Sequence, residues 1–272
     1  MKRSWLYIIL LILSGCAKQT DWELSEQGET LIVVEATITN EKKPQEVYLH
    51  YNMSDLSDEP IPLSDAQVII TDEDSTWQLK EDSLFAGKYY TKTDLVALTN
   101  KNYSLLVIDG GKVYSAQANM VPGRTFNPLI YSKNEDDDLY HIDYVASAFE
   151  AEDPAMWEVR LDWSGVPGYE GMEKSYTTKK LLFYTLTTLD VSQVFAPVVE
   201  EVSFPAGTII EQKRYSLTAG HTEFIRSLLL ETSWQGGVFP TDPANVTSNI
   251  STGGMGYFAV CAVNTLSITV TP

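Results

Sequence analysis

The side chains that could do chemistry in this sequence of 272 residues are three histidines, two cysteines and 37 carboxylates. His50, His141 and His221 are far apart in the sequence, and none has further ligands at the spacing of zinc sites. The Gly-x-Ser-x-Gly turn of serine hydrolases is absent, and Trp163-Ser164-Gly165 matches only a fragment of it. Carboxylates are too numerous for one pair to stand out as general acid and base. We therefore predict no catalytic residues, no cofactor and no enzymatic activity.

Two runs of acidic residues are the remaining candidates for a metal site, Asp72-Glu73-Asp74 and Glu135-Asp136-Asp137-Asp138. A calcium loop interleaves its carboxylates with other oxygen ligands and turn-forming residues, as in Asp-x-Asp-x-Asp-Gly. Adjacent acids do not fit that pattern. We interpret both runs as solvated loops and predict no metal site.

The N-terminus carries the clearest signal of the chain. Met1-Lys2-Arg3 precedes a run of nine apolar residues from Trp5 to Leu13, which leads to Leu13-Ser14-Gly15-Cys16. Such a run is too short to span a bilayer, which takes about 20 apolar residues. Cations, a short apolar run and small residues before a break are typical of a secretory signal, here residues 1–15.

The cysteine after Leu-Ser-Gly resembles the bacterial lipobox. This resemblance implies cleavage before Cys16, a lipidated Cys16 with acyl chains such as palmitate, and a membrane contact through that anchor. Residues 16–28 then form a polar tether. Ala17, where an Asp would favour the inner membrane in enteric bacteria, implies the outer membrane. The protein would lie on its periplasmic face or at the cell surface.

The charge of the chain limits its partners. The net charge is −18, and loss of Lys2 and Arg3 with the signal makes it more negative. Nucleic-acid binding needs a basic footprint, so we predict no nucleic-acid partner. Adhesion to anionic lipid is equally disfavoured, which leaves the anchor as the membrane contact. Cys261 lies in an apolar run without a partner cysteine, and we expect a buried free thiol.

Residues 29–123 contain about seven short strands separated by turn residues. The stretch from Thr30 to Thr39 is rich in β-branched residues, and Asp109-Gly110-Gly111-Lys112 is a tight hairpin signal. This spacing predicts an immunoglobulin-like β-sandwich. Pro-Leu-x-x-Ala-x-Val, Gly-Lys-Tyr-Tyr and Tyr-x-Leu-x-Val in this order resemble transthyretin-like and carboxypeptidase-regulatory-like modules.

Val121-Pro122-Gly123-Arg124 predicts a domain boundary, followed by a second, β-rich domain over residues 124–272. Alternation of Trp157, Val159, Leu161 and Trp163 with polar residues predicts a strand with one buried face. A single helix is expected at 219–233 with Thr218 as its N-cap, because its apolar residues follow helical spacing. The fold class is therefore mainly all-β.

The C-terminal stretch carries a family resemblance. Trp234-Gln235-Gly236-Gly237-Val238-Phe239-Pro240 leads to Asn249-Ile250-Ser251-Thr252-Gly253-Gly254-Met255-Gly256-Tyr257-Phe258 and a final strand. Together with Leu31-Ile32-Val33-Val34-Glu35-Ala36 near the start, this resembles the family of Bacteroidota lipoproteins known as domain of unknown function 4249. Gly253, Gly254 and Gly256 permit positive φ or a close backbone approach, and a strand rather than a phosphate-binding helix follows them.

Members of that family are often encoded near TonB-dependent outer-membrane receptors. The resemblance implies a non-catalytic binding or accessory subunit of a nutrient-uptake system, with such a transporter as partner. A glycan or peptide ligand would contact exposed aromatic residues, and Trp77, Tyr169 and Trp234 lie in loop-like contexts.

Two other functions stay open. A fimbrillin-like structural or adhesion lipoprotein also combines a lipobox with paired β-sandwiches. Its assembly by strand exchange would need a removable N-terminal strand behind an Arg or Lys cleavage site. Residues 17–40 contain only Lys18, close to the anchor, which counts against this function. A surface hydrolase is the third, less favoured reading, and a buried carboxylate pair or triad would support it.

Overall fold

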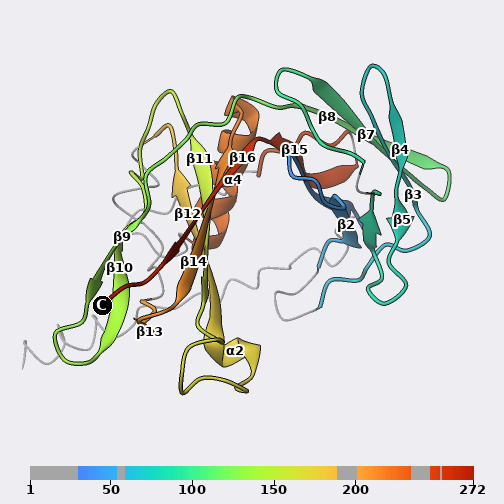
Figure 1. Ribbon diagram of the computed structural model, residues 1–272. Coiled ribbons are helices and arrows are strands. Elements are labelled where there is room, and N and C mark those ends of the chain that lie inside the picture. Colours follow the sequence, from blue (N-terminus) through green and yellow to red (C-terminus); the bar gives the residue numbers. More distant parts are fainter. Residues whose placement is uncertain (1–29, 54–58, 93, 189–200, 234–245, 252) are drawn as a thin grey trace, which may run out of the picture. The chain divides into compact units, whose positions relative to one another are not determined.

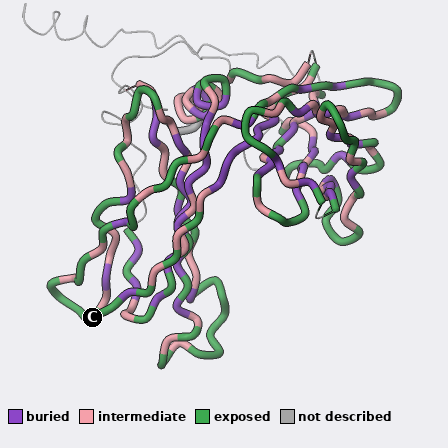
Figure 2. The backbone as a smooth tube through the Cα atoms, turned by 45° about the horizontal axis from the view of Figure 1, so that its top comes forward, coloured by how far each residue is buried: buried purple, intermediate pink, exposed green. Residues whose placement is uncertain are grey.

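The computed structural model describes residues 30–53, 59–92, 94–188, 201–233, 246–251 and 253–272. Strands dominate these residues, and the predicted all-β fold is confirmed (Figure 1). Buried residues lie mostly on the strands, whereas the turns are mainly exposed (Figure 2).

Two sheets form a β-sandwich from the N-terminal part of the chain. The first has the order β15-β1-β2-β6-β5 and the second the order β4-β3-β7-β8. The strands of the first are β15 (Gly254–Cys261), β1 (Ile32–Thr39), β2 (Glu46–Tyr51), β6 (Lys88–Tyr90) and β5 (Lys80–Glu81). Those of the second are β4 (Thr76–Gln78), β3 (Gln67–Thr71), β7 (Asn102–Asp109) and β8 (Lys112–Asn119).

The core of this sandwich follows from alternation along its strands. On β1, Ile32, Val34, Ala36 and Ile38 are all buried. Successive side chains of a strand point to opposite faces, so these four residues share the face that packs on the second sheet. The hairpin predicted at Gly110-Gly111 connects β7 to β8. The β-sandwich expected over the first part of the chain is therefore present.

One strand of this sandwich comes from the far end of the sequence. β15 pairs with β1 in parallel, in a register that places Val34 opposite Gly256, while β2 pairs with the other edge of β1 in antiparallel fashion. Phe258 and Val260 of β15 are buried in the same core as the β1 residues. The division into 29–123 and 124–272 stays a prediction, but the first sheet is completed from the second range.

Gly253, Gly254 and Gly256 each require glycine for a local structural reason. Gly253 and Gly256 have φ values of +88° and +87°, a region that L side chains rarely adopt. Gly254 has no such φ, but a Cβ on it would meet the side chain of Ile250. The expectation of positive φ or close approach is thus confirmed.

Two further sheets carry the rest of the described chain. One has the order β12-β11-β14-β16 and the other the order β13-β10-β9. The strands of the former are β12 (Thr178–Thr185), β11 (Ala155–Asp162), β14 (Ile209–Ser216) and β16 (Val263–Thr269). Those of the latter are β13 (Phe204–Pro205), β10 (Leu139–Tyr144) and β9 (Ile130–Lys133).

The alternation predicted on β11 is confirmed, with one exception. Trp157, Val159 and Leu161 are buried in the core of these sheets. Glu158 is buried as well, although the pattern assigns it to solvent. Its carboxylate lies 2.6 Å from Arg160 Nε and 3.0 Å from Lys180 Nζ. Burial alone would raise the pKa of Glu158, but these two cations hold it below the usual range.

Helix α4 (Ala219–Ser233) has the predicted bounds, while the one-turn helix α2 (Lys174–Thr177) was not expected. Thr218 Oγ1 accepts a hydrogen bond from His221 N at 3.3 Å, which confirms the N-cap. Ile225 is buried, and Phe224 and Leu229 pack against the same small core, which includes Tyr215 of β14 and Ala259 of β15. Leu228 is more exposed than the helical spacing suggests.

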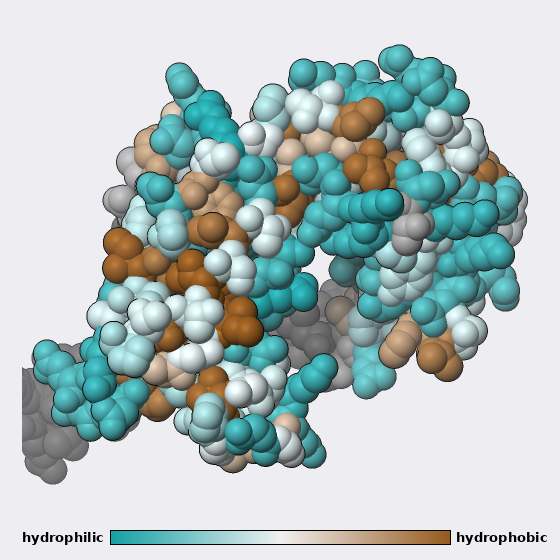
Figure 3. All heavy atoms as spheres, viewed as in Figure 1, coloured by the Kyte–Doolittle hydropathy of each residue, from teal (hydrophilic) through white to brown (hydrophobic). Residues whose placement is uncertain are grey.

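The face shown in Figure 3 is largely hydrophilic over the N-terminal sandwich, in keeping with the negative charge. More hydrophobic residues gather over the C-terminal strands (Figure 3). Among the described residues, no helix is both long and apolar enough to cross a bilayer.

Candidate functional site

The residues that the sequence predicted as sites do not come together. Cys16 and Trp234 lie outside the described residues. Trp77, on β4, is half-buried against the N-terminal core and lines a cavity of about 390 Å³. Tyr169 is half-buried against the C-terminal core. Trp77 and Tyr169 therefore pack against two different cores and do not form a shared aromatic platform.

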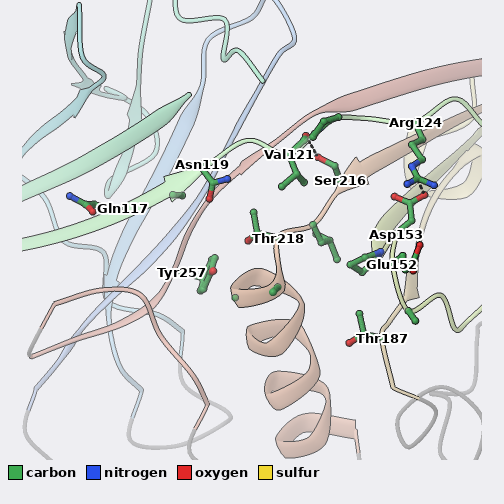
Figure 4. Close-up of a pocket in the computed structure, with 17 residues that line it drawn as sticks. Gln117, Asn119, Val121, Arg124, Glu152, Asp153, Thr187, Ser216, Thr218 and Tyr257 are labelled. Atoms are coloured by element: carbon green, nitrogen blue, oxygen red, sulfur yellow. Dashed lines mark hydrogen bonds and ion pairs between the residues drawn. The ribbon is translucent and has the colours of Figure 1, made fainter. Parts of the chain in front are cut away.

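A cleft of about 720 Å³ lies in another part of the described chain, and we call it the β8–α4 cleft (Figure 4). Strand β8, the turn after it, the loop before β11 and the first turn of α4 form its walls. The lining residues are Gln117, Ala118, Asn119, Val121, Pro122, Arg124, Ala151, Glu152, Asp153, Pro154, Thr187, Ser216, Leu217, Thr218, Ala219, Gly220 and Tyr257. Its volume lies in the range of about 300–1,000 Å³ that is typical of ligand pockets.

The turn predicted as a domain boundary, Val121-Pro122-Gly123-Arg124, forms one rim of the cleft and is held in place. Ser216 Oγ donates to Val121 O at 3.1 Å and accepts from Ala262 N at 2.9 Å. A Cβ on Gly123 would lie 3.1 Å from the Cβ of Ala262. These contacts fix the turn against β14 and the residue between β15 and β16.

A charged triad begins at the last residue of this turn, Arg124, and includes Asp153 and Arg214. Arg214 is 4% exposed, and its Nη2 is 2.7 Å from Asp153 Oδ1 and donates to the Asp153 carbonyl at 3.2 Å. Its guanidinium also lies over the ring of Trp157, 5.5 Å from the centroid. Arg124 Nε approaches the other carboxylate oxygen of Asp153 at 3.5 Å and is 64% exposed (Figure 4). Arg214 therefore anchors the loop, while Arg124 keeps a cation accessible at the rim.

The first turn of α4 is packed tightly on Tyr257. A Cβ on Gly220 would lie 2.9 Å from Tyr257 Oη, so only glycine fits there without movement. Burial raises the pKa of Tyr257, and a hydrogen bond with the Thr218 side chain opposes this. Figure 4 shows Thr218 and Tyr257 facing the cleft from neighbouring elements. The cleft thus offers two hydroxyl groups beside the start of the helix.

Cys261 of β15 and His221 of α4 resemble a nucleophile and its base. Cys261 Sγ lies 3.7 Å from His221 Nδ1, and the imidazole stacks on Tyr257 with ring centroids 5.0 Å apart. Burial raises the pKa of the thiol to about 12 and lowers the pKa of the imidazole to about 4. At neutral pH the thiol is therefore protonated and the imidazole uncharged, which is the reverse of an activated pair. Cys261 is buried and free, as predicted.

The acidic runs are engaged by backbone N–H groups of their own turns and by lysines. Lys101 Nζ lies 2.8 Å from Asp72 Oδ2 and 2.8 Å from Asp74 Oδ2. Asp72 Oδ1 accepts from the backbone N–H groups of Asp74 and Ser75, and Asp137 Oδ1 accepts from Leu139 N. Asp138 pairs with Lys133 at 2.7 Å. Across the described ranges, no group of three histidine, cysteine or acidic side chains is arranged to hold a metal ion.

The cleft residues were missed by sequence reasoning, although two signals lay beside them. The Val121-Pro122-Gly123-Arg124 turn and the Thr218 cap were both identified, one as a boundary and one as a helix start. Their proximity depends on the pairing of β15 with β1 and of β14 with β16, which brings segments about 100 residues apart into contact. A local pattern does not reveal such a contact.

Comparison with known proteins agrees with the resemblance seen in the sequence. No curated protein matches this chain. The model of the family described as domain of unknown function (DUF4249) matches residues 18–267. Since the match covers most of the 272 residues, the chain belongs to the DUF4249 family.

Proposed function

We propose that this protein is a lipid-anchored outer-membrane protein that binds a nutrient in the β8–α4 cleft and acts as the accessory subunit of a TonB-dependent transporter. It does so without catalysis, at the periplasmic face or at the cell surface. The observation that carries the proposal is the cleft itself, a pocket of about 720 Å³ built from several elements.

The lining chemistry supports reversible binding. Amide side chains at Gln117 and Asn119, hydroxyl groups at Thr218 and Tyr257, and the cation of Arg124 all line the cleft. A few placed polar groups among apolar ones are typical of ligand sites, where they orient the ligand and give specificity. The ion pair of buried Arg214 with Asp153 holds one wall in a fixed position, which lowers the cost of ordering on binding.

The N-terminal sequence supports the anchor. Residues 1–15 have the composition of a secretory signal, and Cys16 follows Leu-Ser-Gly. The polar residues 16–28 then lead to β1, which begins at Ile32 in the interior of a sheet. A folded domain would thus hang from the membrane on a short tether.

The position of β1 argues against the fimbrillin-like alternative. β1 has β15 on one edge and β2 on the other, and four of its side chains are buried. A strand that is removed for assembly must leave without dissolving the core. Loss of β1 would break two ladders and expose that core, so strand exchange at this position is energetically unfavourable.

The test is isolation of the full tagged chain from native membranes in mild detergent, with mass spectrometry of what accompanies it. We expect a TonB-dependent transporter in near-equal amount. Recovery of the protein alone, or as a ladder of its own oligomers, would contradict the accessory role. The Cys16→Ser variant is the matched control, and it should lose both palmitate labelling and membrane association.

A further inference from the structure

The outer edge of β8 runs along the β8–α4 cleft, and its backbone groups are oriented by their neighbours. Ser115 N donates to Ser251 Oγ at 2.9 Å, and Ser115 O accepts from Ser251 N at 2.8 Å. Both groups of Ser115 therefore point away from β7. Because orientation alternates along an antiparallel strand, the backbone groups of Gln117 and Asn119 point the same way.

This edge is closed at both ends and open between them. Gln117 O accepts from Asn249 Nδ2 at 3.2 Å, and two residues past Asn119 the carbonyl of Val121 accepts from Ser216 Oγ at 3.1 Å. Within the described residues, nothing pairs with Gln117 N or with either backbone group of Asn119. At about 3.3 Å per residue, the opening from Gln117 to Val121 is about 13 Å long.

The open stretch faces the cleft rather than bulk solvent alone. Gln117 and Asn119 both line it, opposite the hydroxyl groups of Thr218 and Tyr257 (Figure 4). Unpaired strand edges pair readily with another extended chain, and proteins normally cover or interrupt them. Here Asn249 and Ser216 interrupt the edge on either side and leave a gap with defined ends.

We propose that the ligand is an extended peptide, of which three to four residues add to β8 as a further strand between Asn249 and Ser216. The inference rests on the proposed binding function of the cleft and specifies its ligand class. N–H groups that repeat every second residue, about 6.6 Å apart, match the carbonyls of a second strand. Sugar hydroxyl groups have no such repeat. The backbone edge gives affinity for any sequence, and the side chains of the cleft select among sequences.

The experiment uses the purified full chain in detergent and a synthetic library of random hexapeptides. Bound peptides are separated with the protein by size exclusion and identified by mass spectrometry, and one retained peptide is measured by calorimetry. Asn119→Pro removes only an outward N–H, so the β7–β8 ladder keeps its bonds. Asn119→Ala removes the side chain and keeps the N–H, which makes it the matched control.

We expect Asn119→Pro to bind the peptide at least about tenfold more weakly than Asn119→Ala, because both variants lack the amide side chain and only the proline leaves one backbone acceptor of the peptide unpaired. Should the proline variant fail to fold, N-methylation of the retained peptide at alternate residues replaces it. Methylation of the peptide N–H groups that face β8 should then abolish binding, whereas methylation of the alternate N–H groups, which face away from β8, should not.

Other results would overturn the inference in distinguishable ways. Equal affinity of Asn119→Ala and Asn119→Pro, or equal effects of both methylation phases, excludes edge pairing while the cleft remains a binding site. Retention of an oligosaccharide library with no hexapeptide retained overturns the peptide class but not the proposed function. Dimers that Asn119→Pro dissociates would show that a second copy covers the edge. Failure to retain either library, with no transporter in the membrane isolate, overturns the proposed function itself.

Discussion

Gly256 lies directly opposite Val34 across the parallel pair of β15 and β1, and the two backbones approach so closely that no side chain fits between them. A Cβ on Gly256 would lie 2.8 Å from Val34 N and closer still to Val34 O. This contact joins the two ends of the described chain, because β1 opens it and β15 is its penultimate strand.

Substitution of this glycine should be costly. We expect Gly256→Ala to lower the free energy of unfolding by about 2–4 kcal/mol, because it adds a backbone clash to an unfavourable φ of +87°. Gly110→Ala is the control, since Gly110 has a φ of +52° and open space around it, and should cost about 1 kcal/mol. Urea unfolding measures both variants. An equal loss in both would show that the approach to Val34 does not matter.

The N-terminal sandwich should not fold from the N-terminal range alone. A fragment of residues 29–123 lacks β15, and with it the buried side chains of Phe258 and Val260. We expect this fragment to show neither a cooperative thermal transition nor dispersed amide signals, because one edge of β1 and part of the core are exposed. Cooperative unfolding of the fragment, measured by circular dichroism, would instead support an autonomous domain that ends near Gly123.

Stability should fall in acid because of His221. Its folded pKa of about 4 lies below the value of 6.5 for an exposed histidine, since burial disfavours the charged form. The unfolded chain therefore binds the proton first, and stability is lost as the pH falls from 6.5 towards 4. Between pH 7 and pH 4.5, His221→Phe should lose about 2 kcal/mol less than wild type.

Phe224→Leu provides the control for that measurement. Phe224 stacks on Tyr257 in the same aromatic cluster, with centroids 4.8 Å apart, but carries no titrating group. The free energy of unfolding of this variant should be lower than that of wild type by the same amount at both pH values. If His221→Phe and wild type lose the same stability in acid, as urea titrations at the two pH values would reveal, His221 is not the group responsible.

The stability of the protein should depend on Asp153 in the wall of the cleft and not on Arg124. Asp153→Asn leaves the buried guanidinium of Arg214 without its counter-charge, and we expect a loss of about 2–4 kcal/mol. Arg124→Ala removes a cation that is 64% exposed, and should change stability by about 0.5 kcal/mol or less. Thermal unfolding separates the two cases. If Asp153→Asn were as stable as wild type, the backbone carbonyl of residue 153 alone would satisfy Arg214.

The sequence by itself determined the local structure of this protein. β-Branched residues predicted β1, alternation of apolar and polar residues predicted β11, and Gly110-Gly111 predicted a hairpin. Helical spacing with the Thr218 cap predicted α4 at its observed bounds. Each of these depends on residues within one or two turns or strands of one another, where propensity and periodicity act directly. The family was recognised for the same reason, from short motifs at the two ends.

Only the tertiary structure decided which distant segments meet. The parallel pairing of β15 with β1, the pairing of buried Glu158 with Lys180 of the neighbouring strand, and the β8–α4 cleft all depend on contacts between different elements. The aromatic residues chosen for a ligand, Trp77 and Tyr169, pack against two different cores instead of meeting. A local pattern records that a residue is apolar or turn-forming, whereas the partner it packs against is set by the free energy of the whole assembled core.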